Sequence, residues 1–217
     1  MANFAALASK QDELIRKALD VSLFVAPFSA DPIVALTGAD STLAALPTGY
    51  VDGGLMTDEG LRFGRDVESS DITSMGRVEP TRSDIESDVG TVQVDFQEVN
   101  ITTIGLYIGA DMSTVTPDPT SGEIQIPKPA RPTVRYYRIL ALGMDEIEEG
   151  EIYVAKFFPR ARIVTWEEQA WQKGDSAIQW GMTFQAYVDE TLGYSEMPIF
   201  AGPGWQAQLA AMGFDAS

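Results

Sequence analysis

Cysteine and histidine are both absent from this chain of 217 residues. The absence of cysteine excludes a disulfide framework and a thiolate metal site. The absence of histidine excludes Ser-His-Asp and Cys-His nucleophilic sites, imidazole metal ligands and the usual general base near neutral pH. Enzyme chemistry would need carboxylates, Lys or Tyr instead. Because the sequence also lacks a phosphate loop ending in Gly-Lys-Ser/Thr, we expect a protein that works without a cofactor.

Basic residues are scarce: 15 Lys and Arg stand against 32 Asp and Glu, and the formal net charge is −17. Affinity for a nucleic-acid backbone comes mainly from Lys and Arg that neutralise phosphates. A surface this acidic repels DNA, so we expect no specific DNA binding.

Long hydrophobic runs are also missing. The longest, Val21–Phe28, contains a proline and is far shorter than the roughly 18 residues that mark a membrane helix. No basic segment precedes the first apolar residues, so no signal peptide is expected. The composition therefore predicts no membrane partner.

Alternation of apolar and polar residues is the clearest structural signal that is present. With 45% hydrophobic residues, the chain can build the core of one large domain or of one domain with arms. The predicted strands are Leu61–Val67, Thr91–Gln97, Val134–Met144, Ile152–Trp166 with a bend at Pro159, and Ala177–Asp189. This pattern predicts a mainly β fold, a β-sandwich or barrel-like domain with one or two flanking helices.

Between the first two predicted strands lies a polar stretch, Ser69–Asp88, which we interpret as a long loop. A tight hairpin needs only a few residues, and a loop this long in a compact domain is usually functional or disordered. Its apolar residues are Ile72, Met75, Val78 and Ile85. The loop therefore suggests a device for contacting a neighbouring molecule.

Helical periodicity and capping residues predict four short helices. They lie within Asn3–Asp20, from the Asp40-Ser41-Thr42 cap to Leu46, after Asn100 with Ile101, Ile104 and Ile108 on one face, and after Trp205. The resulting division is an N-terminal arm of residues 1–48, a β domain of residues 49–200 and a C-terminal arm of residues 201–217. The N-terminal helix packs either on its own domain or on a neighbouring subunit.

An acidic segment follows one predicted strand and contains Asp145, Glu146, Glu148, Glu149 and Glu151. A calcium site is one hypothesis for this segment, but the Asp-x-Asp-x-Asp-Gly loop pattern is missing. We therefore prefer a solvated acidic turn and predict no metal site.

Three stretches carry a resemblance to a known family: LAALPTGYVDGGLMTDEGLRF, DVESSDITSMGRVEPTRSD and GTVQVDFQEVN. In order and spacing they resemble the major tail proteins, or tail tube proteins, of long-tailed bacteriophages. Tyr50–Gly60 matches the turn of that family, Ile72–Gly76 matches its loop motif, and Val92, Val94 and Phe96 match its strand. Met75 stands where the family commonly has Trp.

The resemblance implies a structural virion protein that forms stacked hexameric rings, surrounds a tape-measure protein and conducts DNA through the tail. The implied partners are other copies of the chain, the tape-measure protein, and the tail terminator and tail tip proteins. The implied location is the virion tail, with assembly in the host cytoplasm. In this interpretation the loop residues Ile72, Met75, Val78 and Ile85 contact the next ring.

The resemblance also places the strands beside the long loop in the inner wall of the tube. The candidate lumen-lining residues are then Arg62, Asp66, Glu68, Gln93, Asp95 and Gln97. We expect a carboxylate such as Asp66, or one from an adjacent subunit, to neutralise Arg62.

Two other functions are compatible with a β-sandwich. One is a capsid-decoration or binding module, which the fold class alone permits. The other is a carboxylate-based glycosidase, which needs two carboxyl groups at a defined separation in a cleft. The sequence indicates no such pair, so the predicted function is structural and not enzymatic.

Overall fold

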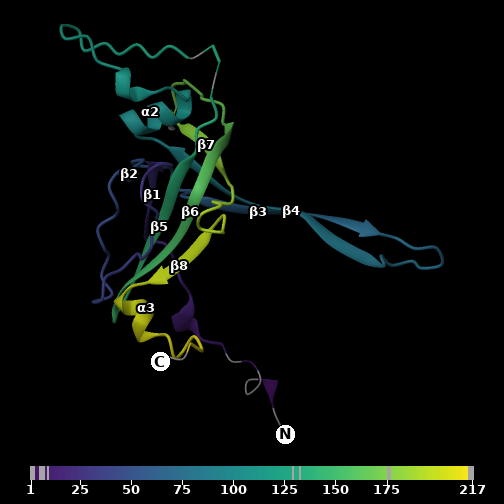
Figure 1. The fold of residues 1–217 in the computed structure, drawn as a ribbon. Helices are drawn as coiled ribbons and strands as arrows, with labels where there is room; N and C mark the ends of the chain where they lie inside the picture. Colours follow the sequence, from purple (N-terminus) through teal and green to yellow (C-terminus); the bar gives the residue numbers. More distant parts are fainter. Residues whose placement is uncertain are drawn as a thin grey trace.

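The computed structural model describes residues 3, 4, 8, 10–128, 130, 131, 133–174 and 177–214. Within these residues the chain forms an eight-stranded antiparallel sheet and two short α-helices, α2 and α3 (Figure 1). The strands are β1 (Asp20–Pro27), β2 (Val51–Asp52), β3 (Arg62–Ile72), β4 (Arg82–Phe96), β5 (Tyr137–Ile147), β6 (Gly150–Trp166), β7 (Trp180–Ala186) and β8 (Met197–Ala201). The helices are α2 (Ile101–Ile108) and α3 (Pro203–Ala207). The predicted mainly β fold with one or two flanking helices is confirmed.

The strand order is β2-β1-β5-β6-β7-β4-β3. β8 lies off this order and pairs with the first part of β6, whereas β7 pairs with the last part of β6. The segment after β2 bridges β1 and β4, the strands next to the two ends of this order. The N–H of Gly53 donates to the carbonyl of Leu23 in β1 at 2.9 Å, and the N–H of Thr57 donates to the carbonyl of Asp95 in β4 at 2.9 Å. Gly53 is required at this closure, since a Cβ there would lie 2.4 Å from the ring of Phe96. The sheet is therefore barrel-like.

The inside of the curled sheet is filled by one apolar cluster. Alternate residues of a strand point to the same face, so five strands and α2 supply its members. The fully or almost fully buried members include Leu23, Val92, Val94, Phe96, Leu106, Ile139, Phe158, Met182 and Phe184. The apolar faces predicted from alternation for the strands at Thr91–Gln97 and Ala177–Asp189 form part of this cluster.

The outer face of β5 and β6 carries a second apolar cluster. Leu140 of β5 and Phe157 of β6 pack here against Ile33 and Leu36 from the segment between β1 and β2. Since Ile139 faces the inner cluster and Leu140 the outer one, β5 is buried on both faces.

The helix predicted within Asn3–Asp20 is helical at Phe4, whose carbonyl accepts from the N–H of Ala8 at 2.8 Å, but it is wrong for residues 10–20, where only Asp12–Leu14 is helical, as a 3₁₀ turn. Residues 5–7 and 9 of this stretch lie outside the described residues. Asp20 instead begins β1, which pairs with β5 over eight positions. The β-branched and aromatic residues of β1 fit this buried sheet position, and the pairing outweighs the local helical periodicity.

The helix predicted from Asp40 to Leu46 is also wrong. The carboxylate of Asp40 accepts from the N–H of Thr42 at 3.2 Å and from its hydroxyl at 2.8 Å. These contacts close a turn, and Thr37 and Leu43 form an isolated antiparallel bridge across it. The same side chain that caps a helix can thus stabilise a turn when no helical residues follow.

The helix predicted after Asn100 is confirmed as α2. The side chain of Asn100 accepts from the N–H of Thr103 at 2.9 Å, and Gly109 ends the helix with a φ of 70°. The C-terminal helix begins at Pro203 and not after Trp205, because proline suits the first position of a helix. The division into arm, domain and arm stays a prediction, although residues 20–27 of the expected arm form a strand of the sheet.

Candidate functional site

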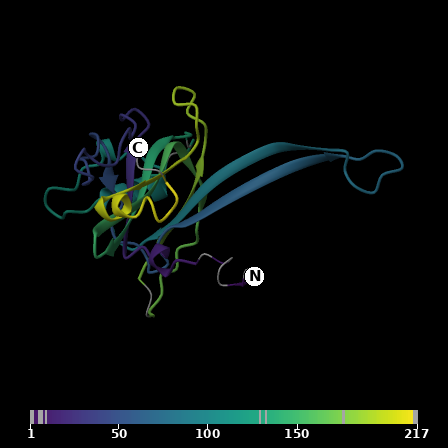
Figure 2. The ribbon, with the colours of Figure 1, turned by 90° about the horizontal axis from the view of Figure 1, so that it is seen from below.

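The β3–β4 hairpin projects from the body of the molecule, as Figure 2 shows. Most of the stretch predicted as a loop at Ser69–Asp88 is paired strand, so this prediction is corrected. Ser69 pairs with Ile85 and Ile72 pairs with Arg82, after a bulge between Glu68 and Ser69. The connecting loop is only residues 73–81. Alternation did not show these strands because both of their faces are exposed to solvent.

The tip of the hairpin exposes the apolar side chains that the sequence singled out. Met75 and Val78 have relative exposures of 105% and 102%, and Ile72 and Ile85 are also exposed. The tip is closed by its own hydrogen bonds, in which the N–H and the hydroxyl of Thr81 both donate to the carbonyl of Ile72, at 2.8 and 2.9 Å. The chain therefore holds four apolar side chains in water at the end of an ordered arm.

At the base of the hairpin, one face of β3 and β4 is polar and the other is apolar. Arg62 lies opposite Gln93, and Phe63 lies opposite Val92. Because side chains alternate along a strand, Asp66 and Glu68 share the face of Arg62, and Asp95 shares that of Gln93. The predicted lining residues of the two strands are thus brought together on one face, and Val92, Val94 and Phe96 are buried on the other.

Two of the residues assigned to these faces need a correction in detail. Phe63, on the apolar face of β3, is half-exposed at the edge of the core, stacked on Phe158 at 6.4 Å and lying under the Nζ of Lys156 at 4.8 Å. Gln97 lies one residue beyond β4, and its N–H donates to the carbonyl of Leu55 at 2.8 Å.

The polar face continues from the hairpin onto β7. Thr91, Gln93 and Asp95 pair with Gln185, Thr183 and Gly181, respectively. A Cβ at Gly181 would lie 2.4 Å from a carboxylate oxygen of Asp95, so glycine lets this carboxylate lie flat on the sheet. We call this surface, formed by the polar side chains of β3, β4 and β7, the polar strip.

Arg62 is neutralised within its own chain. Its guanidinium forms ion pairs with Asp95 at 2.5 Å and with Glu59. The expected partner Asp66 forms no ion pair with Arg62 in the described residues, because it lies four residues along the same strand. Asp95 lies diagonally across the neighbouring strand, within reach of a long side chain.

A model of the phage tail tube protein family matches residues 8–195. The chain belongs to the phage tail tube protein family. No curated protein matches the sequence. Among solved structures, the chain is similar to one from the cryo-EM structure of the anti-feeding prophage baseplate, 6-fold symmetrised, with 9% identity and a TM-score of 0.42. That match covers 82% of this chain and 91% of the other.

Family membership makes this tail tube protein a structural component of the virion tail and not an enzyme. Its partners are other copies of itself and other tail components. The glycosidase and the capsid-decoration module are therefore not retained. In the described part of the chain, no helix is long and apolar enough to cross a membrane.

The acidic turn of the tail tube protein shows no metal site. Among the described residues, no group of three or more carboxylates is placed to hold an ion. One oxygen of Asp145 accepts from the backbone N–H of Glu146 at 3.0 Å, and the other from that of Lys17 at 3.3 Å. Asp145 is thus buried with both oxygens bonded to backbone N–H groups, whereas the four glutamates of the turn are exposed.

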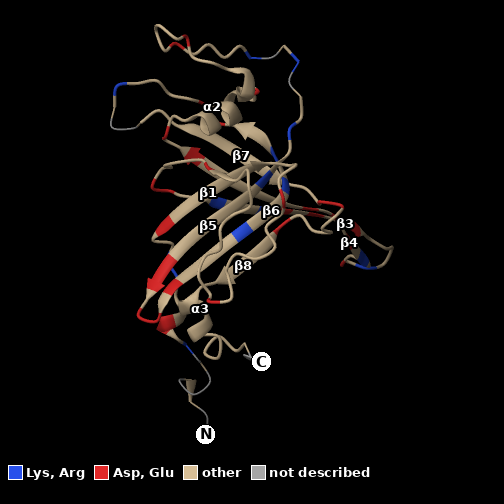
Figure 3. Ribbon diagram, turned by 60° about the vertical axis from the view of Figure 1, so that its left-hand side comes forward, with Lys and Arg blue, Asp and Glu red and all other residues tan. Residues whose placement is uncertain are grey.

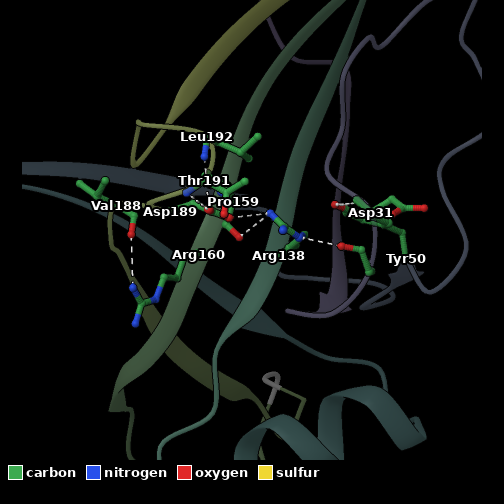
Figure 4. A network of polar contacts seen from close by, with 10 residues as sticks. Asp31, Tyr50, Arg138, Pro159, Arg160, Val188, Asp189, Thr191 and Leu192 are labelled. Atoms are coloured by element: carbon green, nitrogen blue, oxygen red, sulfur yellow. Dashed lines mark hydrogen bonds and ion pairs between the residues drawn. The ribbon is translucent and has the colours of Figure 1, made fainter.

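A buried ion pair that sequence reasoning missed holds the outer face of the sheet (Figure 4). Arg138 of β5 donates to Asp189 at 3.1 Å, and also to the carbonyls of Ala30 at 2.8 Å and of Pro159 at 3.1 Å. Pro159 lies where the register of β5 and β6 shifts. Arg138 therefore joins three distant segments at the bend of β6.

Burial disfavours the charged form of Asp189, but other contacts outweigh it. The backbone N–H groups of Thr191 and Leu192 donate to the carboxylate, and Arg138 adds its positive charge. The pKa of Asp189 is therefore lowered from its usual value of 3.8. The local Asp-x-Thr sequence could have indicated this turn, but nothing local indicates the arginine.

Proposed function

We propose that this chain assembles into hexameric rings that stack to form the tail tube of a long-tailed phage. The tube surrounds a tape-measure protein during assembly in the host cytoplasm and later conducts DNA. Tail terminator and tail tip proteins bind its two ends. The observation that carries this proposal is the projecting β3–β4 hairpin, whose tip exposes Met75 and Val78 almost completely.

In this proposal the hairpin tip contacts the next ring. Burying one Met, Val or Ile side chain contributes roughly 1.5–3 kcal/mol, and the contact repeats at every subunit of every ring. Ile72 and Ile85, on the shaft of the hairpin, are exposed as well and extend the contact surface. The paired strands mean that the arm is formed before it meets its neighbour, so little ordering entropy opposes the contact.

Within a ring, the polar strip faces the lumen and the sheets of adjacent subunits join edge to edge. β3 ends the strand order, so one of its edges has no partner strand in the described residues. An unpaired edge favours pairing with another chain.

The polar strip suits the passage of DNA without capture. Asp66 and Glu68 repel phosphates, and Arg62 is neutralised by Asp95 and Glu59. The net charge of −17 acts in the same direction.

Negative-stain electron microscopy of the purified protein tests the proposed function directly. We expect rings and tubes of uniform diameter, with six subunits around the axis in class averages. A protein that stays monomeric or forms a small closed oligomer at millimolar subunit concentration would contradict the proposal.

A further inference from the structure

Three arginines and three aromatic rings lie together on the outer face of the sheet, on the far side of the bend in β6. The guanidinium of Arg160 lies 4.3 Å from the ring centroid of Tyr136, and that of Arg162 lies 5.1 Å from that of Tyr187. The two tyrosines meet edge to face at 5.7 Å. Phe28 and the paired Arg138 complete the group. We call Arg160, Arg162, Tyr136 and Tyr187 the arginine–tyrosine cluster.

The two arginines of this cluster lack carboxylate partners. Neither Arg160 nor Arg162 forms an ion pair with any described residue, whereas the neighbouring Arg138 uses Asp189. Their Nε atoms are buried without a hydrogen-bond partner in the described part of the chain. Arg160 has only a long contact of 3.4 Å to the carbonyl of Val188. Two uncompensated cations on aromatic rings are unusual in a chain with 32 acidic residues and 15 basic ones.

The turn between β5 and β6, in contrast, has carboxylates without basic partners. Glu146, Glu148, Glu149 and Glu151 are exposed, and none of them forms an ion pair with a described residue. No Lys or Arg occurs between Asp145 and Tyr153. Figure 3 shows Asp and Glu gathered at this end of the sheet, near α3.

On the β3–β4 hairpin, two acidic residues do have basic partners, whereas Asp66, Glu68 and Glu86 form no ion pair with a described residue. Asp88 pairs with Arg65 and Asp84 pairs with Arg82, both at 2.6 Å. The β5–β6 turn is therefore a run of four exposed glutamates that form no ion pair with a described residue.

The turn cannot reach the cluster of its own chain. Eleven residue steps of β6 separate Glu149 from Arg160, which is about 35 Å at about 3.3 Å per residue. From this geometry we propose that the arginine–tyrosine cluster binds the acidic β5–β6 turn of another copy of the chain. Such a contact joins two different surfaces, so it repeats from copy to copy and generates a ring or a filament.

This proposal rests on the proposed assembly into stacked rings and names one contact between copies. The other candidate for a cationic cluster is the phosphate backbone of DNA. Arg162 pairs with Gln185, which continues the polar strip, so a cluster left uncovered would hold DNA beside the proposed channel. A carboxylate turn that covers the cluster removes this obstacle, and the net charge of −17 disfavours DNA.

Charge reversal on the two surfaces tests the contact. We expect R160E/R162E and E148K/E149K each to raise the critical concentration for tube formation at least about tenfold in sedimentation assays, because like charges meet. Combining all four substitutions in one chain restores complementary charges and returns the value to within about threefold of the wild type. K128E/K173E, which has the same change in net charge as R160E/R162E at two exposed sites, leaves it unchanged.

Introduced cysteines test the same contact by geometry, because the chain has none of its own. E149C/R160C forms a ladder of disulfide-linked oligomers, since the two sites of one chain are too far apart for a bond of at most about 7 Å between Cα atoms. E149C alone and R160C alone form no ladder, and a mixture of the two gives only dimers. E149C/K173C is the matched control and gives no ladder.

The outcomes separate this contact from the proposed function. If the wild type forms tubes and both charge-reversed variants do so equally well, the contact is wrong and the proposed function stands. If the wild type forms neither rings nor tubes, the proposed function itself is wrong. If R160E/R162E does not fold, E148K/E149K decides, because it changes only exposed side chains. A short DNA duplex that binds the wild type and not R160E/R162E would assign the cluster to nucleic acid instead.

Discussion

Asp189 shows how a single residue holds distant parts of this chain together. Only 3% of its surface is exposed, and its partner Arg138 is buried beside it. We expect Asp189→Asn to lower the free energy of unfolding by about 3 kcal/mol or more, because it leaves a buried guanidinium without its counter-charge. Thermal or urea unfolding of the unassembled protein measures this loss. Asp118→Asn is the matched control: Asp118 accepts from the N–H groups of Thr120 and Ser121 in the same way, but it is exposed and forms no ion pair with a described arginine. An equal effect of both substitutions would contradict a special role of the buried pair.

The pH dependence of the same site follows from the sign of its pKa shift. The pKa of Asp189 is lowered in the folded state, so the carboxylate stabilises the fold above the usual value of 3.8 and loses this effect as the pH falls through the lowered folded pKa. We expect the difference in unfolding free energy between the wild type and Asp189→Asn to be constant from pH 7 to about pH 5 and to shrink below pH 3.8. A difference that grows on acidification would show that the pKa is raised instead.

Met75 carries a prediction at the residue scale for assembly. Met75→Asp places a charge on the fully exposed tip, so the fold is unaffected, but the proposed contact with the next ring becomes unfavourable. We expect unchanged circular dichroism and thermal unfolding, and tubes that are much shorter or absent in electron micrographs. Val34→Asp is the control, because Val34 is another exposed apolar residue, at 89%, outside the hairpin. Normal tubes from Met75→Asp would show that the tip is not the contact.

The β3–β4 hairpin and β7 form the element that the proposal places along the channel. Gln93 lies on the polar strip and Val92 in the core, so single cysteines at these positions distinguish the faces. In assembled tubes, we expect a small thiol reagent that diffuses through the lumen to label Gln93→Cys and not Val92→Cys. A bulky reagent labels Gln93→Cys in the unassembled protein but not within tubes. Equal labelling of Gln93→Cys by the bulky reagent before and after assembly would place the strip outside the lumen.

At the scale of the whole molecule, the acidic surface determines how the tube interacts with DNA. Asp66→Lys with Glu68→Lys reverses charge on the polar strip and leaves the ion pair of Arg62 with Asp95 intact. We expect tubes of this variant to retain linear duplex DNA in co-sedimentation, with retention that falls as salt rises, whereas wild-type tubes retain none. Glu123→Lys with Glu168→Lys makes the same change in net charge at exposed sites away from the strip. Equal DNA retention by both variants would show that net charge matters and the position of the strip does not.

The sequence by itself determined those elements whose two faces differ in environment. Val92, Val94 and Phe96 alternate with polar residues because one face of β4 is core and the other is wet, and the same holds for Met182 and Phe184 of β7. The helix after Asn100 could be predicted from the sequence because its N-cap is a local contact: the side chain of Asn100 accepts from an N–H only three residues away. The order of the short motifs from Tyr50 to Phe96 indicated the tail tube family that the family match then showed.

Only the tertiary structure decided features that depend on residues far apart in the chain. The distal part of the hairpin has no apolar face, so its sequence did not distinguish a strand from a loop. The backbone pairing of Ser69 with Ile85 in the folded chain shows that it is a strand. β1 became a strand because β5, more than one hundred residues later, offered it a paired and buried position. Arg138 and Asp189, 51 residues apart, meet only where β6 bends at Pro159. Patterns of period two or 3.6 record which side of an element is buried, whereas partner strands and buried charges are selected by the packing of the whole chain.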